Sequence, residues 1–480
     1  MGALPEYLIT VAGELPLRSA RTRPRFYRAL IENIRDAVNR ASARVLESEV
    51  VEAKVFIVTD KDVISRVAKV FGVYRVGRVL RYNFRDLGDL AKWAYENTKD
   101  IVIGKKFAVR VKRSGFHSFT SLDVAREVGA LLKPLSAGVD LEKPDITVEL
   151  EIRGSTAYLY RESLKGPGGL PTGIEGRALA LFSGGFDSPV AAWMAAKRGI
   201  QVDFLHFVMG SQKPSYYAFL VAKYLASEWL YGYKPKFIVV DLRDVVVEVS
   251  KKVDWSFRQV VLRALMYVAS SKMALLGGYD AVVTGESVGQ ASSQTLKNLS
   301  AIERAVKPQV PILRPLMGLD KEEIIELSRR VGLYELSSKV AEACAIAPRR
   351  VSTSSEPEDV LHQLDRINMT ILDNALSSAK VVSVLEGFPE ELLPADEIEV
   401  DFVPEGALII DARSGNERRE KPIPGAIPLE QLDPSKAPRN RVVVVVCETG
   451  QVSYILAKML REQGIKAFSL KGGVRGCPLK

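Results

Sequence analysis

Apolar and amphipathic segments alternate along most of the chain, and this alternation predicts an α/β multidomain protein. Residues 7–11 have the β-branched and aromatic content of a strand, and the spacing of apolar positions predicts a helix from about 23 to 44. Further on, the strict alternation of residues 146–152 predicts another strand, and helices are expected near 87–95 and 122–132. Strands that alternate with helices are typical of α/β or α+β packing.

Two breaks interrupt this pattern. Residues 165–173 are rich in glycine and proline, and residues 352–357 are rich in serine and threonine. Between them, apolar strands alternate with helices in the doubly wound manner, and the last 85 or so residues begin a new α/β pattern. We therefore expect domains at residues 1–50, 51–165, 166–351 and 397–480, with a linker at residues 352–396.

The sharpest chemical signal lies at residues 179–190. An apolar strand ends in Ser183-Gly184-Gly185, and a helix is expected to begin at residue 188 or 189. Glycine backbone N–H groups can turn towards an anion, and the helix N-terminus adds partial positive charge. The hydroxyls of Ser183 and Ser188 can donate hydrogen bonds, whereas Asp187 beside a phosphate needs a cation, such as Mg²⁺. The alternative is an ordinary glycine turn between a strand and a helix.

A second polar cluster follows the apolar pair 282–283 and runs from Thr284 to Thr295. A buried strand that leads into a glycine-containing loop would lie at the carboxyl edge of the same sheet, where ligands bind. The cluster is a weak signal by itself and a stronger one beside the Ser-Gly-Gly loop.

Cys447 is the third chemical signal. It follows five valines at 442–446 and precedes a helix expected at residue 453. In such a loop, backbone N–H groups and the helix dipole stabilise a thiolate or a persulfide anion. The alternative is a buried structural cysteine. The other cysteines are Cys344 and Cys477, and the absence of any CxxC or HxxxH pair argues against a structural zinc site.

Composition and charge narrow the class of protein. A content of 47% hydrophobic and 26% charged residues is typical of a globular protein, and a net charge of +9 is compatible with a polyanionic partner. Two basic runs near the N-terminus, residues 15–31 and 101–120, contain no acid, and the alternative is that they are only solvated faces. The candidates for RNA contacts are Arg18, Arg21, Arg25, Lys105, Arg110, Lys112 and Arg113.

Two features concern the location of the protein. We find no apolar run close to the roughly 20 residues of a membrane helix. The first residues also lack the basic and apolar regions of a secretory signal, so the expected location is cytoplasmic.

Together these strings resemble the tRNA 4-thiouridine sulfurtransferase (ThiI-type) family over nearly the whole chain. The resemblance implies a ferredoxin-like domain at 1–50, an RNA-binding THUMP domain at 51–165, a PP-loop ATP pyrophosphatase domain at 166–351 and a rhodanese-like domain at 397–480. It is carried by residues 13–18, 107–113, 144–148, 183–188, 284–290 and 313–316, and by 411–413 and 423–428 for the last domain. Many rhodanese-like loops carry an arginine where this chain has Thr449.

The resemblance also implies the site residues. Catalytic roles fall to Cys447, to Asp187 and to Cys344, which would resolve the persulfide by forming a disulfide. Without the resemblance, Cys344 and most of the nucleotide contacts would be taken for core or surface residues. The implied nucleotide contacts are Leu181, Phe182, Ser183, Gly184, Gly185, Ser188, His206, Phe207, Arg263, Gly285 and Gln294.

The activity implied by the resemblance is ATP- and Mg²⁺-dependent sulfur transfer to a uridine at position eight of tRNA, through an adenylated intermediate. A cysteine desulfurase would load Cys447 with persulfide sulfur, and a second role would pass sulfur to a carrier protein for thiazole synthesis in thiamine formation.

Three alternatives remain. A PP-loop ligase or amidotransferase would not need Cys447, and a catalytically degenerate tRNA-binding module would have lost Asp187 or Cys447. A sulfur carrier for thiamine without tRNA activity would not need the basic N-terminal part. The sequence leaves open the identity of the desulfurase, the role of Cys477, whether a homodimer forms, and how Cys447 reaches the PP-loop site.

Overall fold

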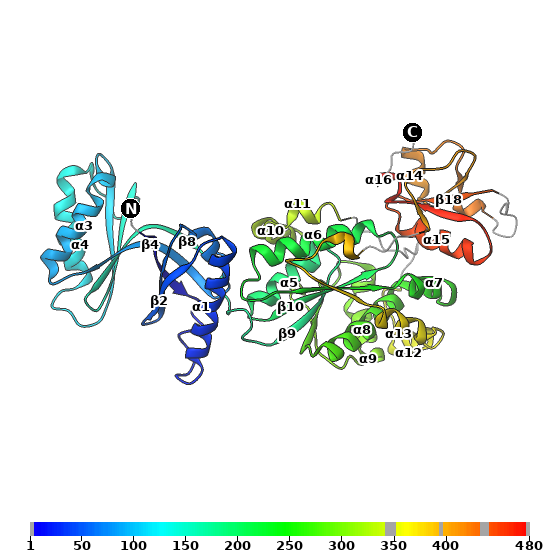
Figure 1. The fold of residues 1–480 in the computed structure, drawn as a ribbon, viewed down its shortest axis with the longest axis horizontal. Coiled ribbons are helices and arrows are strands. Elements are labelled where there is room, and N and C mark those ends of the chain that lie inside the picture. Colours follow the sequence, from blue (N-terminus) through cyan, green and yellow to red (C-terminus); the bar gives the residue numbers. More distant parts are fainter. Residues whose placement is uncertain (1–3, 341–351, 393–396, 433–440, 477–480) are drawn as a thin grey trace. The chain divides into compact units, whose positions relative to one another are not determined.

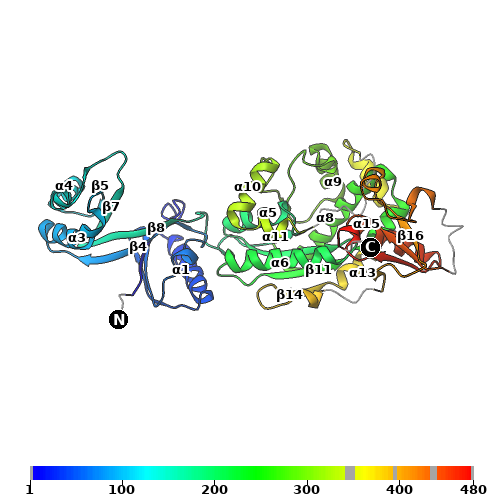
Figure 2. The ribbon, with the colours of Figure 1, turned by 90° about the horizontal axis from the view of Figure 1, so that it is seen from above.

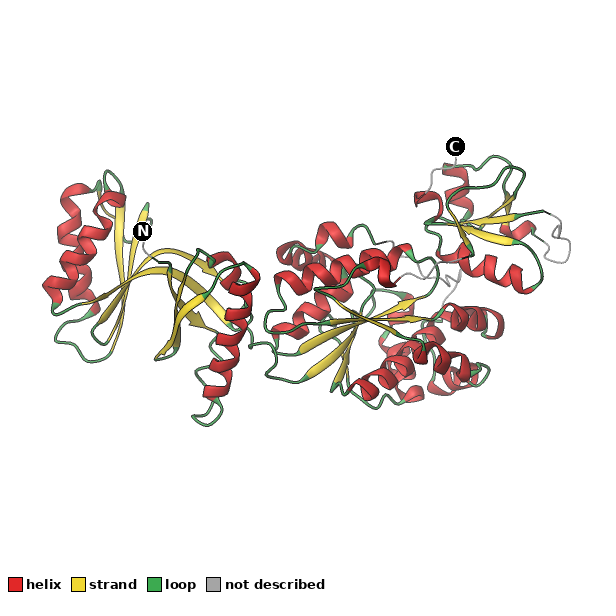
Figure 3. Ribbon diagram, in the orientation of Figure 1, coloured by secondary structure: helices red, strands yellow, loops and turns green. Residues whose placement is uncertain are grey.

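The structure is a computed structural model that describes residues 4–340, 352–392, 397–432 and 441–476. Cys344 and Cys477 therefore lie outside the described residues. The chain divides into two compact units, the first comprising Met1–Ile174 with Lys197–Gly199 and the second Glu175–Ala196 with Ile200–Lys480. The α/β multidomain class predicted from the sequence is confirmed (Figure 3).

One eight-stranded sheet runs through the first unit in the order β2-β3-β1-β4-β8-β7-β5-β6. The long strands β4 and β8 pair over most of their length in the middle of this sheet. They therefore join the strands β2, β3 and β1 on one side to β7, β5 and β6 on the other. The strands are β1 (Glu6–Val11), β2 (Val45–Val51), β3 (Lys54–Thr59), β4 (Val73–Asn83), β5 (Lys106–Ser114), β6 (Gly138–Val139), β7 (Ile146–Arg153) and β8 (Thr156–Lys165). The helices are α1 (Arg23–Arg40), α2 (Ile64–Val67), α3 (Leu87–Val102), α4 (Ser121–Leu132) and η1 (Lys133–Leu135).

The domain boundary expected at residue 50 falls inside β2, so the structure differs from the sequence prediction here. β2 and β3 form an antiparallel hairpin, and Glu52 turns the chain with a φ of 54°. A tight turn of this kind contains no linker residues. The segment from 51 to 83 therefore packs with the N-terminal part, where β1 lies between β3 and β4.

The second unit contains a six-stranded sheet in the order β13-β12-β9-β10-β11-β14. The first five strands are parallel, and helices cover both faces (Figures 1 and 3). The strands are β9 (Arg177–Leu181), β10 (Gln201–Val208), β11 (Lys236–Asp241), β12 (Ala281–Val283), β13 (Ile312–Leu313) and β14 (Lys380–Ser383). The helices are α5 (Asp187–Lys197), α6 (Lys213–Glu228), α7 (Arg243–Lys252), η2 (Trp255–Phe257), α8 (Arg258–Gly277), η3 (Ser292–Gln294), α9 (Leu296–Val306), α10 (Lys321–Val331), α11 (Tyr334–Ser337), α12 (Pro357–Leu364) and α13 (Met369–Ser377).

The strand order places the ligand crevice. The chain leaves β9 towards β10 and β11 on one side, and β12 and β13 lie on the other. The crevice at the carboxyl ends of β9 and β12 is therefore the topological switch point, where open α/β sheets bind ligands.

The structure corrects the prediction of a linker at residues 352–396, because folded elements occupy most of this range. Its described residues form α12, α13, η4 (Pro389–Leu392) and β14, which pairs antiparallel with β11 at the sheet edge. The physical reason is burial: Val360 and Leu372 are fully buried in the same cores as the preceding helices, and Val384 is also fully buried. The serine- and threonine-rich stretch marks only the entry to α12.

A parallel five-stranded sheet in the order β15-β19-β18-β16-β17 forms the C-terminal part of the second unit. Its helix α15 packs on α7, where Tyr454 joins the large core cluster and its hydroxyl accepts a hydrogen bond from Arg243 Nη1 at 2.7 Å. The elements are β15 (Glu399–Val400), β16 (Leu408–Asp411), α14 (Gly415–Glu420), β17 (Ile427–Pro428), η5 (Leu429–Gln431), β18 (Val443–Val446), α15 (Gln451–Glu462), β19 (Ala467–Leu470) and α16 (Gly473–Gly476).

One helical stretch, Trp255–Gly277, is long and apolar enough to cross a membrane by length and composition, contrary to the sequence prediction. More than half of its most apolar window is buried within the fold, as expected for the core helix of a globular domain.

Candidate active site

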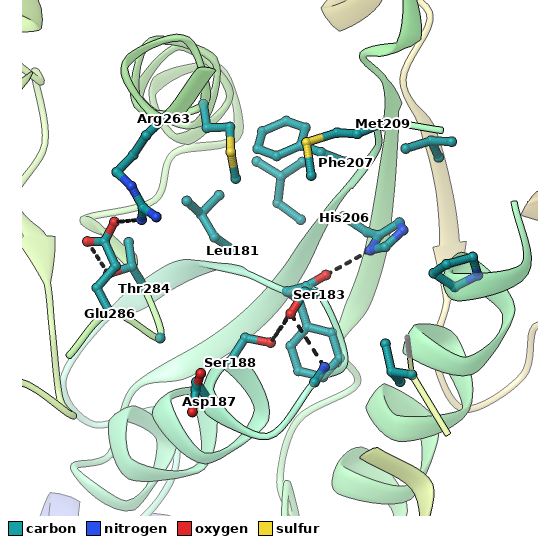
Figure 4. A pocket seen from close by; sticks show the side chains of 18 of the residues that line it. Leu181, Ser183, Asp187, Ser188, His206, Phe207, Met209, Arg263, Thr284 and Glu286 are labelled. Carbon is teal, nitrogen blue, oxygen red and sulfur yellow. Dashed lines mark hydrogen bonds and ion pairs between the residues drawn. The ribbon is translucent and has the colours of Figure 1, made fainter. Parts of the chain in front are cut away.

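A cavity of about 300 Å³ opens at the carboxyl ends of β9, β10 and β12 (Figure 4). It brings together residues that lie more than 100 positions apart in the sequence. Of the predicted nucleotide contacts and Asp187, its lining includes Leu181, Phe182, Ser183, Gly185, Asp187, Ser188, His206, Phe207, Arg263, Gly285 and Gln294.

The loop between β9 and α5 is shaped by two hydroxyl groups. Ser188 Oγ accepts hydrogen bonds from Ser183 N at 3.0 Å and from Gly184 N at 3.3 Å, and it lies 3.1 Å from Ser183 Oγ. These serines therefore hold the loop conformation, a role that the sequence did not predict.

Gly184 belongs to the loop without appearing in the cavity lining. Its φ is +82°, and a Cβ there would lie 2.6 Å from Ala218 Cα, so a side chain would not fit between the loop and α6.

Asp187 is held from two sides. Its Oδ1 accepts from Lys321 Nζ at 2.8 Å, and its Oδ2 accepts from Gln290 Nε2 at 2.9 Å. The sequence prediction missed both partners, although Lys321 begins α10 shortly after the 313–316 string.

Mg²⁺ is commonly held by one or two carboxylates together with substrate phosphates, so a single carboxylate such as Asp187 fits such a site. The described residues contain no cluster of three or more potential metal ligands, and phosphates would have to complete the shell.

Glu286 organises the opposite wall. Its buried carboxylate accepts hydrogen bonds from Arg263, from Tyr267 and, at 2.9 Å, from Arg314 Nε. Burial alone would raise the pKa of Glu286, but the two guanidinium charges and the Tyr267 hydroxyl outweigh it and hold the pKa below its usual value. Arg314 also pairs with Glu303, so the two guanidinium groups of this cluster meet two carboxylates, and only Arg263 of the two arginines lines the cavity. Arg263 Nε is buried without a hydrogen-bond partner in the described structure, as expected of a group that meets an anionic ligand.

His206 is neutral in this environment. Its Nδ1 lies 2.8 Å from the carbonyl oxygen of Phe182, which can only accept, so Nδ1 carries the proton. Its Nε2 therefore accepts from Ser215 Oγ at 2.8 Å. Burial lowers the pKa of His206 to about 4. Since both ring nitrogens are bonded within the protein, His206 has no free nitrogen to offer a ligand.

The buried histidine predicts a pH effect on stability. Below about pH 6.5 the unfolded chain protonates this side chain while the folded chain does not, so the free energy of unfolding falls as the pH falls from 6.5 towards 4. The expected loss is about 3 kcal/mol. Denaturant unfolding at several pH values should show a shallower pH slope for His206→Gln than for wild type, with the exposed His362→Gln as the matched control. Equal slopes for wild type and His206→Gln would contradict the assignment.

Cys447 lies at the end of the fully buried strand β18, with only 4% of its surface exposed. Its sulfur accepts hydrogen bonds from Gly450 N at 3.1 Å and Ser453 N at 3.4 Å, and lies 3.3 Å from Ser453 Oγ. These are the donors expected for an anionic sulfur at a helix N-terminus.

The sequence did not reveal what closes the Cys447 loop from the other side. A Cβ on Gly473, whose φ is +63°, would lie 2.4 Å from Cys447 O, so only glycine permits this close approach. Gln451 links the two sites: it lines the cavity of the phosphate loop, and its Nε2 donates to Ser211 O at 3.1 Å.

The basic candidates lie in the first unit. Arg21, Arg25, Lys105, Arg110 and Lys112 are exposed, whereas Arg18 and Arg113 are partly buried. Arg18 lies over the ring of Phe26, and Arg113 Nη1 lies 2.7 Å from His117 Nδ1. Most of the predicted side chains are therefore accessible to a polyanion.

Comparisons with known proteins match nearly the whole chain. The family described as Thiamine biosynthesis protein (ThiI) matches residues 173–369, the THUMP domain 84–162 and the rhodanese-like domain 396–477. A tRNA sulfurtransferase of Desulfurococcus amylolyticus is 53% identical over 471 residues, which is 98% of each chain. One from Pyrobaculum aerophilum is 37% identical over 97% of this chain and 96% of its own. A crystal structure of a 4-thiouridine synthetase–RNA complex with bound ATP is similar with a TM-score of 0.68 and 27% identity, covering 79% of this chain and 99% of that one.

Proposed function

Since the chain belongs to the tRNA sulfurtransferase (ThiI) family, we propose that it forms 4-thiouridine at position eight of tRNA with ATP and a persulfide carried on Cys447. The observation that carries the proposal is the link between two sites in one compact unit: Gln451, four residues after Cys447, lines the cavity that holds the phosphate loop. The relatives' names and the bound ATP and RNA of the similar crystal structure support the substrates.

The first step is adenylation of the uridine. O4 attacks the α-phosphorus of ATP, the bond to pyrophosphate breaks, and the N3 proton is lost. The loop at 183–188 would hold the pyrophosphate, and Lys321 and Arg263 would supply positive charge. Mg²⁺ on Asp187 would neutralise charge on the departing pyrophosphate.

The second step is sulfur transfer. The terminal sulfur of the Cys447 persulfide attacks C4, and AMP leaves with the former O4. The Cys344 thiolate then attacks Cys447 Sγ, which leaves the sulfur on the base and produces a disulfide that an external thiol must reduce. Val340, which lines the phosphate-loop cavity, precedes Cys344 by four residues in the sequence.

The proposed partners follow from this chemistry. The exposed basic residues of the first unit would contact the tRNA backbone. A cysteine desulfurase would load the sulfur onto Cys447, and we propose that both proteins act in the cytoplasm. Passing sulfur to a thiamine sulfur-carrier protein would use Cys447 without the phosphate loop, so that role would survive the loss of Asp187.

The test is 4-thiouridine formation in unmodified tRNA with ATP, Mg²⁺ and a persulfide donor, read by mass spectrometry of the nucleosides. We expect product only with ATP, and none in a tRNA with cytidine at position eight. Cys344→Ala should accumulate tRNA joined to Cys447 through sulfur and release product only after a thiol is added. Absence of 4-thiouridine with the wild-type enzyme, or ammonia-dependent product in its place, would overturn the proposal in favour of a ligase or amidotransferase.

A further inference from the structure

A second cavity, of about 510 Å³, lies in the second unit beside the phosphate-loop cavity. Pro214, in the first turn of α6, and Val340 line both cavities. On another side, the wall of the second cavity is formed by Thr449 and Gly472, which belong to the two turns that enclose Cys447. This cavity therefore borders both the phosphate-loop site and the sulfur-bearing loop.

The described lining of the second cavity is cationic. Lys213, Lys339 and Arg475 contribute three positive charges, and the described lining residues include no carboxylate. Lys213 and Lys339 are exposed, and neither forms an ion pair with a described residue. Such a lining favours a ligand with phosphate groups. Tyr217 adds an aromatic ring on which an unstacked base can lie.

Arg475 bears on the Cys447 loop in particular. Thr449 stands where many rhodanese-like loops carry an arginine, and the sequence alone gives no replacement for that charge. In the structure Arg475 bonds to Glu448 through Nε at 2.8 Å and lines the cavity together with Thr449. A guanidinium group is thus brought to this loop by a residue 28 positions after Cys447, and the Glu448 carboxylate holds it there.

We propose that this second cavity binds the target nucleotide of the tRNA, with the uracil near Tyr217 and the flanking phosphates on Lys213, Lys339 and Arg475. The inference rests on the proposed function, in which one base must meet both the α-phosphate of ATP and the persulfide of Cys447. A cavity that shares walls with both sites satisfies this requirement, and its volume lies within the range of small-ligand sites.

The first test reverses two charges. In Lys213→Glu/Lys339→Glu, kcat/KM for tRNA should fall at least 30-fold, and the salt dependence of kcat/KM should become shallower by about 1.4 in logarithmic slope, from two lost phosphate contacts. ATP binding and persulfide loading of Cys447 should stay within twofold of wild type. Lys466→Glu, which precedes β19 at the opposite edge of its sheet, is the matched control. A double variant with wild-type kcat/KM and salt slope would overturn the inference.

The second test needs no catalysis. A synthetic tRNA that carries 4-thiouridine at position eight attaches covalently to neighbouring side chains under near-ultraviolet light. We expect attachment to peptides containing Tyr217, residues 338–340 or Thr449, and attachment elsewhere would overturn the inference. Because this tRNA is made chemically, the result holds even if the wild-type enzyme makes no 4-thiouridine, which would defeat the proposed function alone.

Discussion

Cys447→Ala should reduce persulfide-dependent 4-thiouridine formation by about 10³-fold or more, because the variant lacks the atom that carries the sulfur. The sulfur of Cys447 lies among two backbone N–H groups and Ser453 Oγ, which suits an anionic nucleophile. ATP binding should be unchanged, since Cys447 does not line the phosphate-loop cavity. Mass spectrometry of the protein should show a persulfide on wild type and none on the variant.

Two comparisons sharpen this result. Ser453→Ala removes one hydroxyl beside the sulfur and keeps the thiol, so it should lose only about tenfold. Sodium sulfide, which brings its own sulfur, should restore product to Cys447→Ala. Full activity of Cys447→Ala with the persulfide donor would show that the sulfur reaches tRNA by another route.

Asp187→Asn should have the opposite effect to Cys447→Ala: it should impair ATP chemistry and leave persulfide loading intact. The variant keeps the shape of the side chain and removes the charge that binds Lys321 and would hold Mg²⁺. We expect tRNA-dependent pyrophosphate release to fall by about 10²- to 10³-fold, as for other losses of charge stabilisation, while Cys447 still accepts persulfide sulfur.

A magnesium titration checks the cause. Wild-type pyrophosphate release should saturate with Mg²⁺, whereas Asp187→Asn should need far more of it. Asp280→Asn is the matched control, because Asp280 precedes β12 at the amino edge of the same sheet and accepts only from Arg177 N in the described structure. Equal Mg²⁺ dependence in wild type and Asp187→Asn would contradict a metal-binding role.

The sequence revealed those parts of the site whose residues are close together in the chain. The phosphate loop and the Cys447 loop each place a buried strand, glycines and a helix start within about ten residues, so local rules identify them. The pair Asp187–Lys321 joins residues 134 positions apart, and Arg263 meets Glu286 through the packing of α8 on the sheet. No periodicity encodes such long-range pairs.

The linker prediction failed for a related reason. Serine and threonine at 352–357 lowered the local hydropathy. The buried residues that follow recur at helical spacing, Val360 with Gln363 in α12 and Leu372 with Leu376 in α13, but these helices are only 8 and 9 residues long, too short for a clear periodic signal. These two helices are stabilised by packing on α8 and β11, and only the tertiary structure shows that packing.

The strand pair β4–β8 has a consequence for how this protein can be divided. The THUMP match begins at residue 84, immediately after β4 ends. A fragment cut there would lose the neighbour of β8 along nine or more residues of pairing and would expose a long, unprotected strand edge. Such edges template intermolecular pairing, so a THUMP fragment of this chain is expected to aggregate, and a soluble RNA-binding piece has to retain both strands and begin near β1.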